Sequence, residues 1–506
     1  MNNLWEAFQR TVRRVPEHGA IVAGERVYSF AQLADRATDF RRAYQQSGVL
    51  PGDRVLLWMQ SSFHMAAATV ACWGQDAIPV LMDAGCRLPQ MEHALALIEP
   101  RAVVHSGDLP GSVGDPAVSV LEAAEVPRHG QINTLYTPGA LPTDPASIVF
   151  TSGSTGMPKG VVQSHRNIFR GCNTVYQYLG IQDNDVLLCP VPWSFDYGYG
   201  QLLTTLLCGI THVIPGANNP FGICDSLEQH RPSILAGIPS LFAYLMGGMS
   251  PIASIDRSSI RMLTNTGGKL AAPILAQMLD AFDDAEVVLN YGLTETYRSC
   301  FLPPHLVREH SHSIGIPVPG VGIEIMREDG SPAALGEEGE IVHRGNCVCL
   351  GYWRNPDATA ASLRRDPLVH NDVVAGSNAL FTGDVGYRDE QGFLYYIGRR
   401  DQLLKSMGVR VSPHEVEEIL LKSGLVESAA VFAQPHDLLG HEIYAALVPR
   451  EPALFKLQEL KKFAQRNMSQ YMLPRSYVVL DNLPLTTTGK TNYRELEQLT
   501  SQTGGE

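Results

Sequence analysis

The chain has 506 residues, of which 44% are hydrophobic and 18% charged, and its formal net charge is −13. This composition is typical of a globular protein of roughly two to four domains with a sizeable core. An acidic chain without long basic runs argues against nucleic acid or an anionic membrane surface as the main partner.

Nine cysteines are scattered along the chain, with no Cys-x-x-Cys pair and no cluster at zinc-binding spacing. An odd count in a long chain favours a reducing, intracellular setting. Residues 1–19 mix acidic and basic side chains and lack the apolar core of a signal peptide. No run approaches the roughly 18 apolar residues of a membrane span. The sequence therefore predicts a cytoplasmic protein without membrane insertion.

Predicted helices and strands alternate through the first part of the chain. Apolar residues at helical spacing predict a helix over 4–14, and Ser29 is placed to cap a second helix that stops near Gly48. The other expected elements are strands at 26–30, 55–59, 77–82 and 102–105 and helices at 63–74 and 89–98. Such alternation is typical of a largely parallel sheet covered by helices on both faces.

A loose region over 107–144 separates this alternation from a second one. The expected strands are 147–150, 185–190, 211–214, 233–236, 261–265 and 287–290, and the expected helices are 166–178, 199–208, 225–230, 240–246 and 273–282. Because the alternation restarts, we expect two stacked α/β subdomains rather than one long sheet.

The pattern changes again near residue 314. Strands separated by Gly and Pro, at 322–327, 339–344 and 392–397, predict a β-rich subdomain over about 314–398. Helices at 415–422 and 457–467 and strands at 428–433 and 443–449 predict a compact α+β module after it. We therefore expect an α/β protein with a large N-terminal domain over 1–398 and a small C-terminal domain over 399–506.

The stretch TSGSTGMPKG at 151–160 has the composition of a phosphate-binding loop. Its glycines let backbone N–H groups approach an anion closely, and Ser152, Ser154, Thr155 and Lys159 add hydroxyl donors and one positive charge. It is not a Walker A loop, because Lys159 is followed by Gly160 rather than by Ser or Thr. Taken alone, the stretch is also compatible with a solvated Ser/Gly linker.

Other short motifs also carry chemistry. NYGLTE at 290–295 follows an apolar strand, and residues at the carboxyl ends of parallel strands face the ligand crevice of such sheets. A tyrosine there can stack on a base, a threonine can bond a phosphate oxygen and a glutamate can hold Mg²⁺, although a capped turn is equally compatible. Asp384 is suited to accept hydrogen bonds from a ribose diol. Lys490 by itself would be a solvated loop lysine.

Together these motifs resemble the AMP-forming adenylating superfamily, which comprises acyl-CoA synthetases, adenylation domains of peptide synthetases and luciferases. The resemblance covers nearly the whole chain and rests on TSGSTGMPKG at 151–160, NYGLTE at 290–295, TGD at 382–384, GRRDQLLKSMGVRVSPHEVEEIL at 398–420 and LPLTTTGK at 483–490. Three further stretches are most similar to acyl-CoA ligases associated with exosortase systems, namely SFDYGYGQL at 194–202, LTNTGGKL at 263–270 and YGLTETYRSCFLPP at 291–304.

The resemblance implies an enzyme with two half-reactions. A carboxylate attacks the α-phosphorus of ATP to give an acyl-adenylate and pyrophosphate, and a thiol then attacks the mixed anhydride so that AMP leaves. It implies ATP and Mg²⁺ as cofactors, a small carboxylic or amino acid as substrate, and CoA or a phosphopantetheinyl carrier protein as thiol acceptor. The protein's part is chiefly to position the reactants and to neutralise charge.

The resemblance also implies individual roles. Lys490 bridges the carboxylate and the α-phosphate, Thr294 contacts the α-phosphate, and Glu295 with Thr155 holds Mg²⁺. The implied nucleotide-binding residues are Thr151, Ser152, Gly153, Ser154, Thr155, Gly156 and Lys159 at the phosphates, Gly267, Gly268, Asn290, Tyr291 and Gly292 near adenine, and Asp384 and Arg399 at the ribose. The small C-terminal domain is implied to be mobile and to rotate about a hinge at Asp401. That rotation exchanges Lys490 for the Gly408 loop and brings Arg410 near the nucleotide.

The implied acyl pocket consists of Trp193, Phe195, Asp196, Tyr199, Gly200, Ile238 and Thr266. Asp196 stands where amino-acid-activating domains place the aspartate that pairs with the substrate ammonium, and a buried carboxylate without a partner is costly. The exosortase-associated ligases share this Phe-Asp-Tyr-Gly run, so a structural aspartate satisfied by backbone donors is the other interpretation.

Three functions follow as alternatives. The favoured one is an acyl-CoA or acyl-carrier ligase, and the second is a stand-alone amino-acid adenylation enzyme that loads a separate carrier protein. A non-catalytic nucleotide-binding regulator is the third, and the intact Lys490, Glu295 and Asp384 argue against it.

Overall fold

The computed structural model describes residues 3–86, 88–109, 118–128, 136–151, 158–369, 378–400, 404–406, 409–436, 440–486 and 491–503. The chain divides into two compact units, the first formed by residues 1–324 and 342–382 and the second by residues 325–341 and 383–506. This division falls within the strands β16 (Val321–Met326), β17 (Gly339–Gly345) and β20 (Asn378–Arg388). The boundary predicted at residue 398 stays a prediction, and the predicted hinge Asp401 lies outside the described residues.

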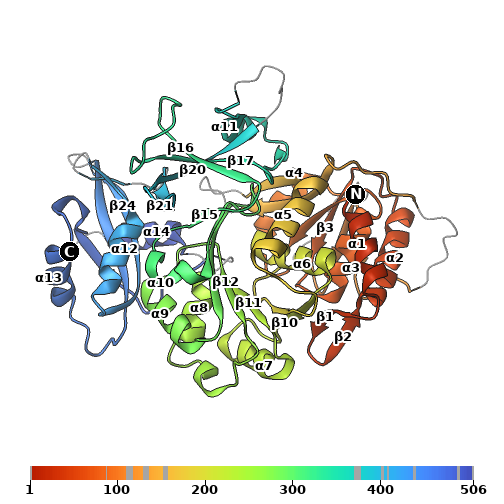
Figure 1. The fold of residues 1–506 in the computed structure, drawn as a ribbon, viewed down its shortest axis with the longest axis horizontal. Coiled ribbons are helices and arrows are strands. Elements are labelled where there is room, and N and C mark those ends of the chain that lie inside the picture. Colours follow the sequence, from red (N-terminus) through yellow and green to blue (C-terminus); the bar gives the residue numbers. More distant parts are fainter. Residues whose placement is uncertain are drawn as a thin grey trace. The chain divides into compact units, whose positions relative to one another are not determined.

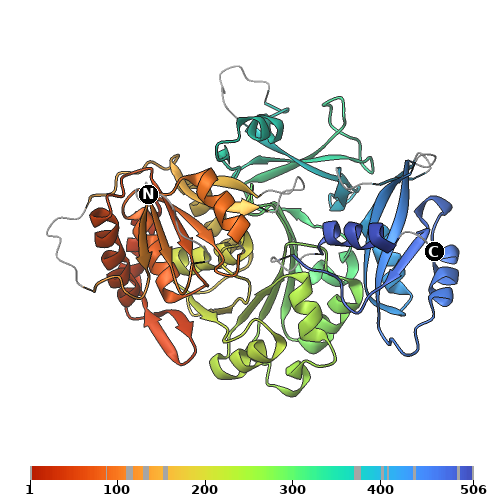
Figure 2. The ribbon, with the colours of Figure 1, turned by 180° about the vertical axis from the view of Figure 1, so that it is seen from behind.

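The first unit contains two large sheets, seen from opposite sides in Figures 1 and 2. The seven-stranded sheet has the order β18-β8-β7-β4-β3-β5-β6, and all its pairs are parallel except β7–β8 and β8–β18. Its strands are β3 (Arg54–Trp58), β4 (Ile78–Met82), β5 (Ala102–His105), β6 (Ser119–Glu122), β7 (Pro145–Thr151), β8 (Lys159–Ser164) and β18 (Gly351–Tyr352). Alternate residues face opposite sides, so Leu57 packs in one core and Leu56 in another.

The nine-stranded sheet has the order β15-β14-β13-β12-β11-β9-β10-β1-β2, and its strands from β13 to β1 are parallel. Its strands are β1 (Gly19–Ala23), β2 (Arg26–Ser29), β9 (Val186–Leu188), β10 (Thr211–Ile214), β11 (Ile234–Gly237), β12 (Met262–Asn265), β13 (Glu286–Tyr291), β14 (Cys300–Leu302) and β15 (Ile316–Pro317). The prediction of two stacked α/β subdomains is confirmed, but the hairpin β1–β2 joins this sheet and not the one formed by its sequence neighbours.

The helices of the first unit cover both sheets. The seven-stranded sheet carries α1 (Leu4–Arg14), α2 (Phe30–Gln46) and α3 (Phe63–Trp73) on one face and α4 (Leu88–Ile98) on the other. Two helices, α5 (His165–Tyr178) and α6 (Asp196–Cys208), contribute side chains to the cores of both sheets, which places them between the sheets. The remaining helices of this unit are α7 (Pro220–His230), α8 (Pro239–Met246), α9 (Ala272–Ala281), α10 (Val307–His310) and α11 (Pro356–Ser362), the last preceding the short strand β19 (Leu363–Arg365).

The second unit is an α+β module. Its strands are β21 (Leu394–Arg399), β22 (Leu404–Ser406), β23 (Val409–Val411), β24 (Val426–His436), β25 (Gly440–Pro449) and β26 (Ser476–Val479), and its helices are α12 (Pro413–Lys422), α13 (Leu457–Asn467) and α14 (Tyr493–Thr503). Helices α12 and α13 cover one face of the β24–β25 pair, and Leu496 of α14 packs on the other. The buried carboxylate of Glu417 joins these layers, because it accepts hydrogen bonds from the Val431 N–H at 2.7 Å and from the Tyr493 hydroxyl at 2.9 Å.

Most expected elements are confirmed, and the differences have local causes. The capping box at Ser29 forms as predicted and α2 ends at Gln46. Helix α6 begins at Asp196, three residues before the predicted start, and its first turn contains Gly198, a residue type that disfavours helices. Gly198 is required there, since a Cβ at this position would overlap the carbonyl oxygens of Val191 and Pro192.

We expect Gly198→Ala to destabilise the first unit by about 1–3 kcal/mol, because the added methyl group forces the start of α6 away from the preceding backbone. The measurement is the free energy of unfolding from denaturant titration. Gly216→Ala is the matched control, since a Cβ at this exposed glycine meets nothing within 4 Å. Equal stability of the two variants would contradict this packing argument.

Candidate active site

A paired hairpin fixes both ends of the predicted phosphate loop. Thr151, the last residue of β7, is the register partner of Lys159, the first residue of β8. The Thr151 hydroxyl donates to the Lys159 carbonyl oxygen at 3.5 Å. The pair therefore brings both ends of the loop to the edge where the parallel strand β7 ends. The predicted residues between them, Ser152, Gly153, Ser154, Thr155 and Gly156, lie outside the described residues.

Glu295, the predicted magnesium ligand, is held by Tyr352. The Tyr352 hydroxyl donates to Glu295 Oε1 at 2.7 Å, and the backbone carbonyl of Glu295 accepts from the Cys349 N–H at 2.8 Å. Burial, followed by the Glu295 carboxylate, raises the pKa of Tyr352, so this hydroxyl remains a donor at neutral pH. The Lys159 ammonium lies 5.4 Å from the centroid of the same ring, within the range of a cation–π contact. One ring thus contacts two predicted ATP-site residues.

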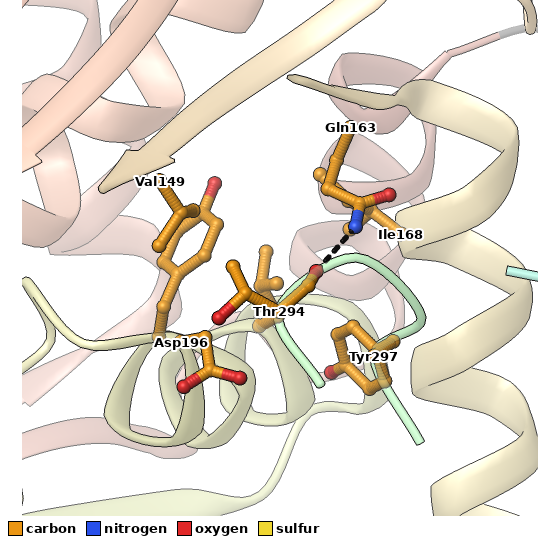
Figure 3. Close-up of a pocket in the computed structure, with 8 residues that line it drawn as sticks. Val149, Gln163, Ile168, Asp196, Thr294 and Tyr297 are labelled. Carbon is orange, nitrogen blue, oxygen red and sulfur yellow. Dashed lines mark hydrogen bonds between the residues drawn. The ribbon is translucent and has the colours of Figure 1, made fainter. Parts of the chain in front are cut away.

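A pocket in the first unit lies beside these residues (Figure 3). Its lining consists of Val149, Gln163, Ile168, Asp196, Tyr199, Leu203, Thr294 and Tyr297. The Gln163 amide donates to the Thr294 carbonyl oxygen at 2.7 Å, which is the dashed line in Figure 3. Since Gln163 belongs to β8 and Thr294 follows β13, this bond joins the two sheets at the pocket.

Asp196 brings a half-buried carboxylate to this pocket from the first turn of α6. Within the described part of the chain, the Asp196 carboxylate makes no hydrogen bond and no ion pair. The backbone donors expected for a purely structural aspartate are therefore not found there. The N-terminus of the helix nevertheless favours an anion at this position, because the macrodipole is positive at that end.

The turn after β13 holds Tyr297 in an uncommon conformation. Its φ of 61° lies in the left-handed region, which bulky residues rarely adopt. The hydroxyl groups of Thr296 and Ser299 lie 3.0 Å apart, and His343 Nδ1 lies 2.9 Å from the Ser299 hydroxyl. The Tyr297 hydroxyl donates to the Gly200 carbonyl oxygen at 3.3 Å. These bonds keep Tyr297 in the pocket wall despite the strain.

Arg298, the next residue, carries a guanidinium group into the interior. It is 5% exposed, and its guanidinium carbon lies 4.9 Å from the Tyr197 ring centroid and 5.6 Å from that of Tyr297. Burial acts to lower the pKa of Arg298, but Tyr178, Tyr197, Tyr297 and Asp196 raise it above its ordinary value. The group therefore stays charged.

The residues predicted near adenine gather at the carboxyl ends of neighbouring parallel strands. The Asn290 amide donates to the Thr264 hydroxyl at 2.9 Å and accepts from the Tyr178 hydroxyl at 2.6 Å, so its side chain joins β13 to β12 and α5. A Cβ on Gly292 would lie 3.1 Å from the Arg298 Cα, so glycine permits this close turn. The other members follow β12 or end β13, namely Gly267 (φ 82°), Gly268 and Tyr291.

The predicted acyl-pocket residues are only partly brought together. Asp196 and Tyr199 line the pocket of Figure 3, whereas Trp193, Phe195, Gly200, Ile238 and Thr266 are not among its lining residues. Trp193 lies in the core, where its indole N–H donates to His212 Nε2 at 3.3 Å. The Thr266 hydroxyl donates to the Asn290 carbonyl oxygen at 3.3 Å. The acyl pocket as a whole stays a prediction.

The second unit brings together the two predicted ribose-binding residues. Asp384 and Arg399 are register partners on β20 and β21, and Arg399 Nη1 lies 3.7 Å from Asp384 Oδ1. Arg410 lies on β23 opposite Lys405, and its side chain is not described. Gly408 and Lys490 lie outside the described residues.

Sequence reasoning did not propose Gln163, Tyr297, Arg298 or Tyr352 as site residues. No local signal connects Tyr352 with a motif near residue 295, because strand pairing brings it there. The sequence does contain an indication for Arg298. This residue stands just before a buried strand, and a charged side chain in such a place needs a partner.

Comparison with known proteins identifies the family. Residues 8–353 match the family described as AMP-binding enzyme, and residues 415–490 match the AMP-binding enzyme C-terminal domain. The chain belongs to the AMP-binding enzyme family.

Its relatives include ligases of two kinds. The chain is 28% identical to a feruloyl-CoA synthase from an Amycolatopsis species, over 95% of this chain and 96% of the relative. It is 29% identical to an L-proline–[L-prolyl-carrier protein] ligase from Streptomyces coelicolor, over 89% and 88%. The solved o-succinylbenzoate CoA synthetase of Bacillus subtilis, in complex with its acyl-adenylate intermediate, has a TM-score of 0.86 at 24% identity and covers 98% of both chains. Another structure of that enzyme contains ATP and a magnesium ion.

We expect Tyr352→Phe to weaken the apparent affinity for Mg²⁺ about tenfold, because the variant keeps the ring beside Lys159 but loses the hydrogen bond that orients Glu295. The measurement is the Mg²⁺ dependence of adenylate formation at saturating ATP. Tyr395→Phe, which removes a hydroxyl bonded to Asp389 in the second unit, is the control. An unchanged Mg²⁺ dependence in Tyr352→Phe would show that the bond does not orient the ligand.

Proposed function

We propose that the protein is an acyl-CoA or acyl-carrier ligase. It activates a carboxylic acid with ATP to an acyl-adenylate, releases pyrophosphate, and transfers the acyl group to the thiol of CoA or of a phosphopantetheinyl carrier protein. The observation that carries this proposal is the contact of one Tyr352 ring with both Lys159 and Glu295 beside the pocket. Membership of the AMP-binding enzyme family and the two kinds of ligase among its relatives support it.

The residues at this edge suit ATP and Mg²⁺. Mg²⁺ is usually held by one or two carboxylates together with substrate phosphates, and Glu295 offers one such carboxylate at the end of β13. When bound, the ion would neutralise charge on the phosphates. Lys159 adds a fixed positive charge at the end of the phosphate loop, and we assign the Thr294 hydroxyl to the α-phosphate.

The residues of the second unit complete the proposed assignment. Asp384 and Arg399 hold the ribose, and Lys490 bridges the reacting carboxylate and the α-phosphate. A lysine is suited to this part, because it is a compact charge on a flexible stem that can arrive for one half-reaction and leave for the other.

Lys490→Ala is expected to abolish adenylation, with a loss of about 10²-fold or more, while thioester formation from a supplied acyl-adenylate continues. The first half-reaction is measured by pyrophosphate exchange and the second by thiol consumption with synthetic acyl-AMP. Lys422→Ala, at the end of α12, serves as the control lysine. Equal loss of both half-reactions would overturn the assignment of Lys490.

A second candidate is a stand-alone amino-acid adenylation enzyme that loads a carrier protein. One observation favours it, namely the pocket-lining carboxylate of Asp196 that has no partner within the described residues. In this case Asp196 binds the ammonium group of the substrate. The N-terminus of α6 favours an anion at this position without a substrate cation, which is why we favour the first candidate.

Asp196→Ala separates the two candidates in a pyrophosphate-exchange screen of amino, fatty and aryl acids. We expect the wild-type protein to exchange with acids that lack an amino group, and Asp196→Ala to retain that exchange. Amino-acid-dependent exchange that is lost in Asp196→Ala and kept in the exposed control Asp283→Ala would instead establish the second candidate.

We further propose that the protein acts in the cytoplasm. All nine cysteines are free thiols, and ATP is an intracellular substrate. None of the helices in the described ranges is long and apolar enough to cross a membrane. The nearer resemblance to exosortase-associated ligases stays a prediction, because none of the relatives named above is described as one.

A further inference from the structure

Arg298 is a buried cation without a carboxylate against it. Among the residues that the structure describes, no Asp or Glu oxygen lies within 4 Å of its guanidinium. Asp196 acts on it through the electric field but makes no ion pair with it. A buried charge without direct compensation is costly, so a chain that keeps one gains something from it.

The guanidinium group also has unused hydrogen-bonding capacity. It presents five N–H donors in a fixed plane. One of them donates to the Tyr297 carbonyl oxygen at 2.6 Å, which is the one hydrogen bond of this guanidinium among the described residues. Its other N–H groups have no acceptor among the described residues, and a carboxylate accepts two such groups in parallel.

Arg298 lies next to the pocket of Figure 3, although its own side chain is not among the lining residues. Tyr297, its neighbour in the chain, lines that pocket, and so does Asp196. Arg298 Nη2 would lie 3.9 Å from a Cβ on Gly200. Residues 196 and 200 are four apart on α6 and share one face of the helix. Arg298 therefore lies beside the surface of α6 that carries Asp196, with the Tyr297 hydroxyl 3.4 Å from the same Cβ position.

We propose that Arg298 binds a second carboxylate of the substrate, so that the enzyme activates dicarboxylic acids. One carboxylate of the acid reacts with ATP, and the other pairs with the Arg298 guanidinium through two parallel N–H···O bonds. Asp196, at the N-terminus of α6, makes no ion pair with the guanidinium. This inference rests on the proposed function and adds the class of acid.

The test compares straight-chain dicarboxylic acids with monocarboxylic acids of the same length. Binding is measured by calorimetry, which needs no chemistry, and activation by pyrophosphate exchange. We expect the wild-type protein to favour the dicarboxylic acid of best length by about a hundredfold in kcat/KM, because a buried polar site rejects a ligand that leaves it unpaired. Arg298→Gln should abolish this preference and leave the monocarboxylic acids unchanged or improved.

Two further variants keep the test decisive. Arg298→Lys retains the buried charge without the planar fork, so it should keep part of the preference even where Arg298→Gln folds poorly. Arg36→Gln removes another buried arginine, one that bonds the Ala123 and Val126 carbonyls, and should not change the ratio between the two acid classes.

The outcomes separate this inference from the proposed function. A wild-type preference for monocarboxylic acids, or an equal loss of both classes in Arg298→Gln, would overturn the role of Arg298 and leave the ligase function standing. Dicarboxylic acids that bind in an Arg298-dependent way without any pyrophosphate exchange would support Arg298 and overturn the ligase function.

Discussion

The arrangement of the site depends on the position of one strand, β8. Its first residue, Lys159, closes the phosphate loop against Thr151, and its pairing with β18 places Tyr352 opposite Val161. Tyr352 then reaches Glu295, which follows a strand of the other sheet. Gln163, also on β8, bonds the Thr294 carbonyl oxygen. A shift of β8 by one residue would turn Lys159 and Gln163 to the opposite face of the sheet and change the partner of Tyr352, so these contacts depend on one register.

Near this strand, several residues carry backbone strain or an unpaired charge, which cost free energy and which a fold without a binding site would avoid. Tyr297 has a left-handed backbone, Arg298 is buried without an ion pair, and Asp196 lines the pocket without a partner in the described ranges. Each cost falls within one pocket region, while the sheets beneath follow ordinary packing rules. Strain and unpaired charge that gather in one place are typical of binding and catalytic sites, where the surrounding structure holds them.

The sequence predicts the fold well where local physics decides it. Helical spacing and a capping box define α1 and α2, and alternation of strands and helices predicts the parallel sheets. The pairing of distant segments could not be predicted from spacing, since β1 and β2 join a sheet whose other members begin near residue 186. Local propensity does not predict the start of α6, because its first turn contains Gly198, which disfavours helices in general but is needed there for a close backbone approach.

The site shows the same division between local and non-local information. Motif residues such as Glu295 and Lys159 are recognisable because their chemistry and spacing lie in short stretches of sequence. Tyr352 comes near them only through the strand pair β8–β18, and no short stretch encodes that contact.

The charges around the pocket favour selection of a substrate by the positions of its charged groups rather than by its net charge. A single anion, Asp196, would favour a cationic substrate, and a single cation, Arg298, would favour an anionic one. Together they are neutral, so neither class of substrate gains from the long-range field alone. Affinity then depends on which group a substrate can reach within hydrogen-bonding distance. Arg298 is 5% exposed and lies against the rings of Tyr197 and Tyr297, whereas Asp196 is half-buried at a helix end. The desolvated cation therefore gains more from a partner than the partly solvated anion does, and this asymmetry favours an acid with a second anionic group over an amino acid.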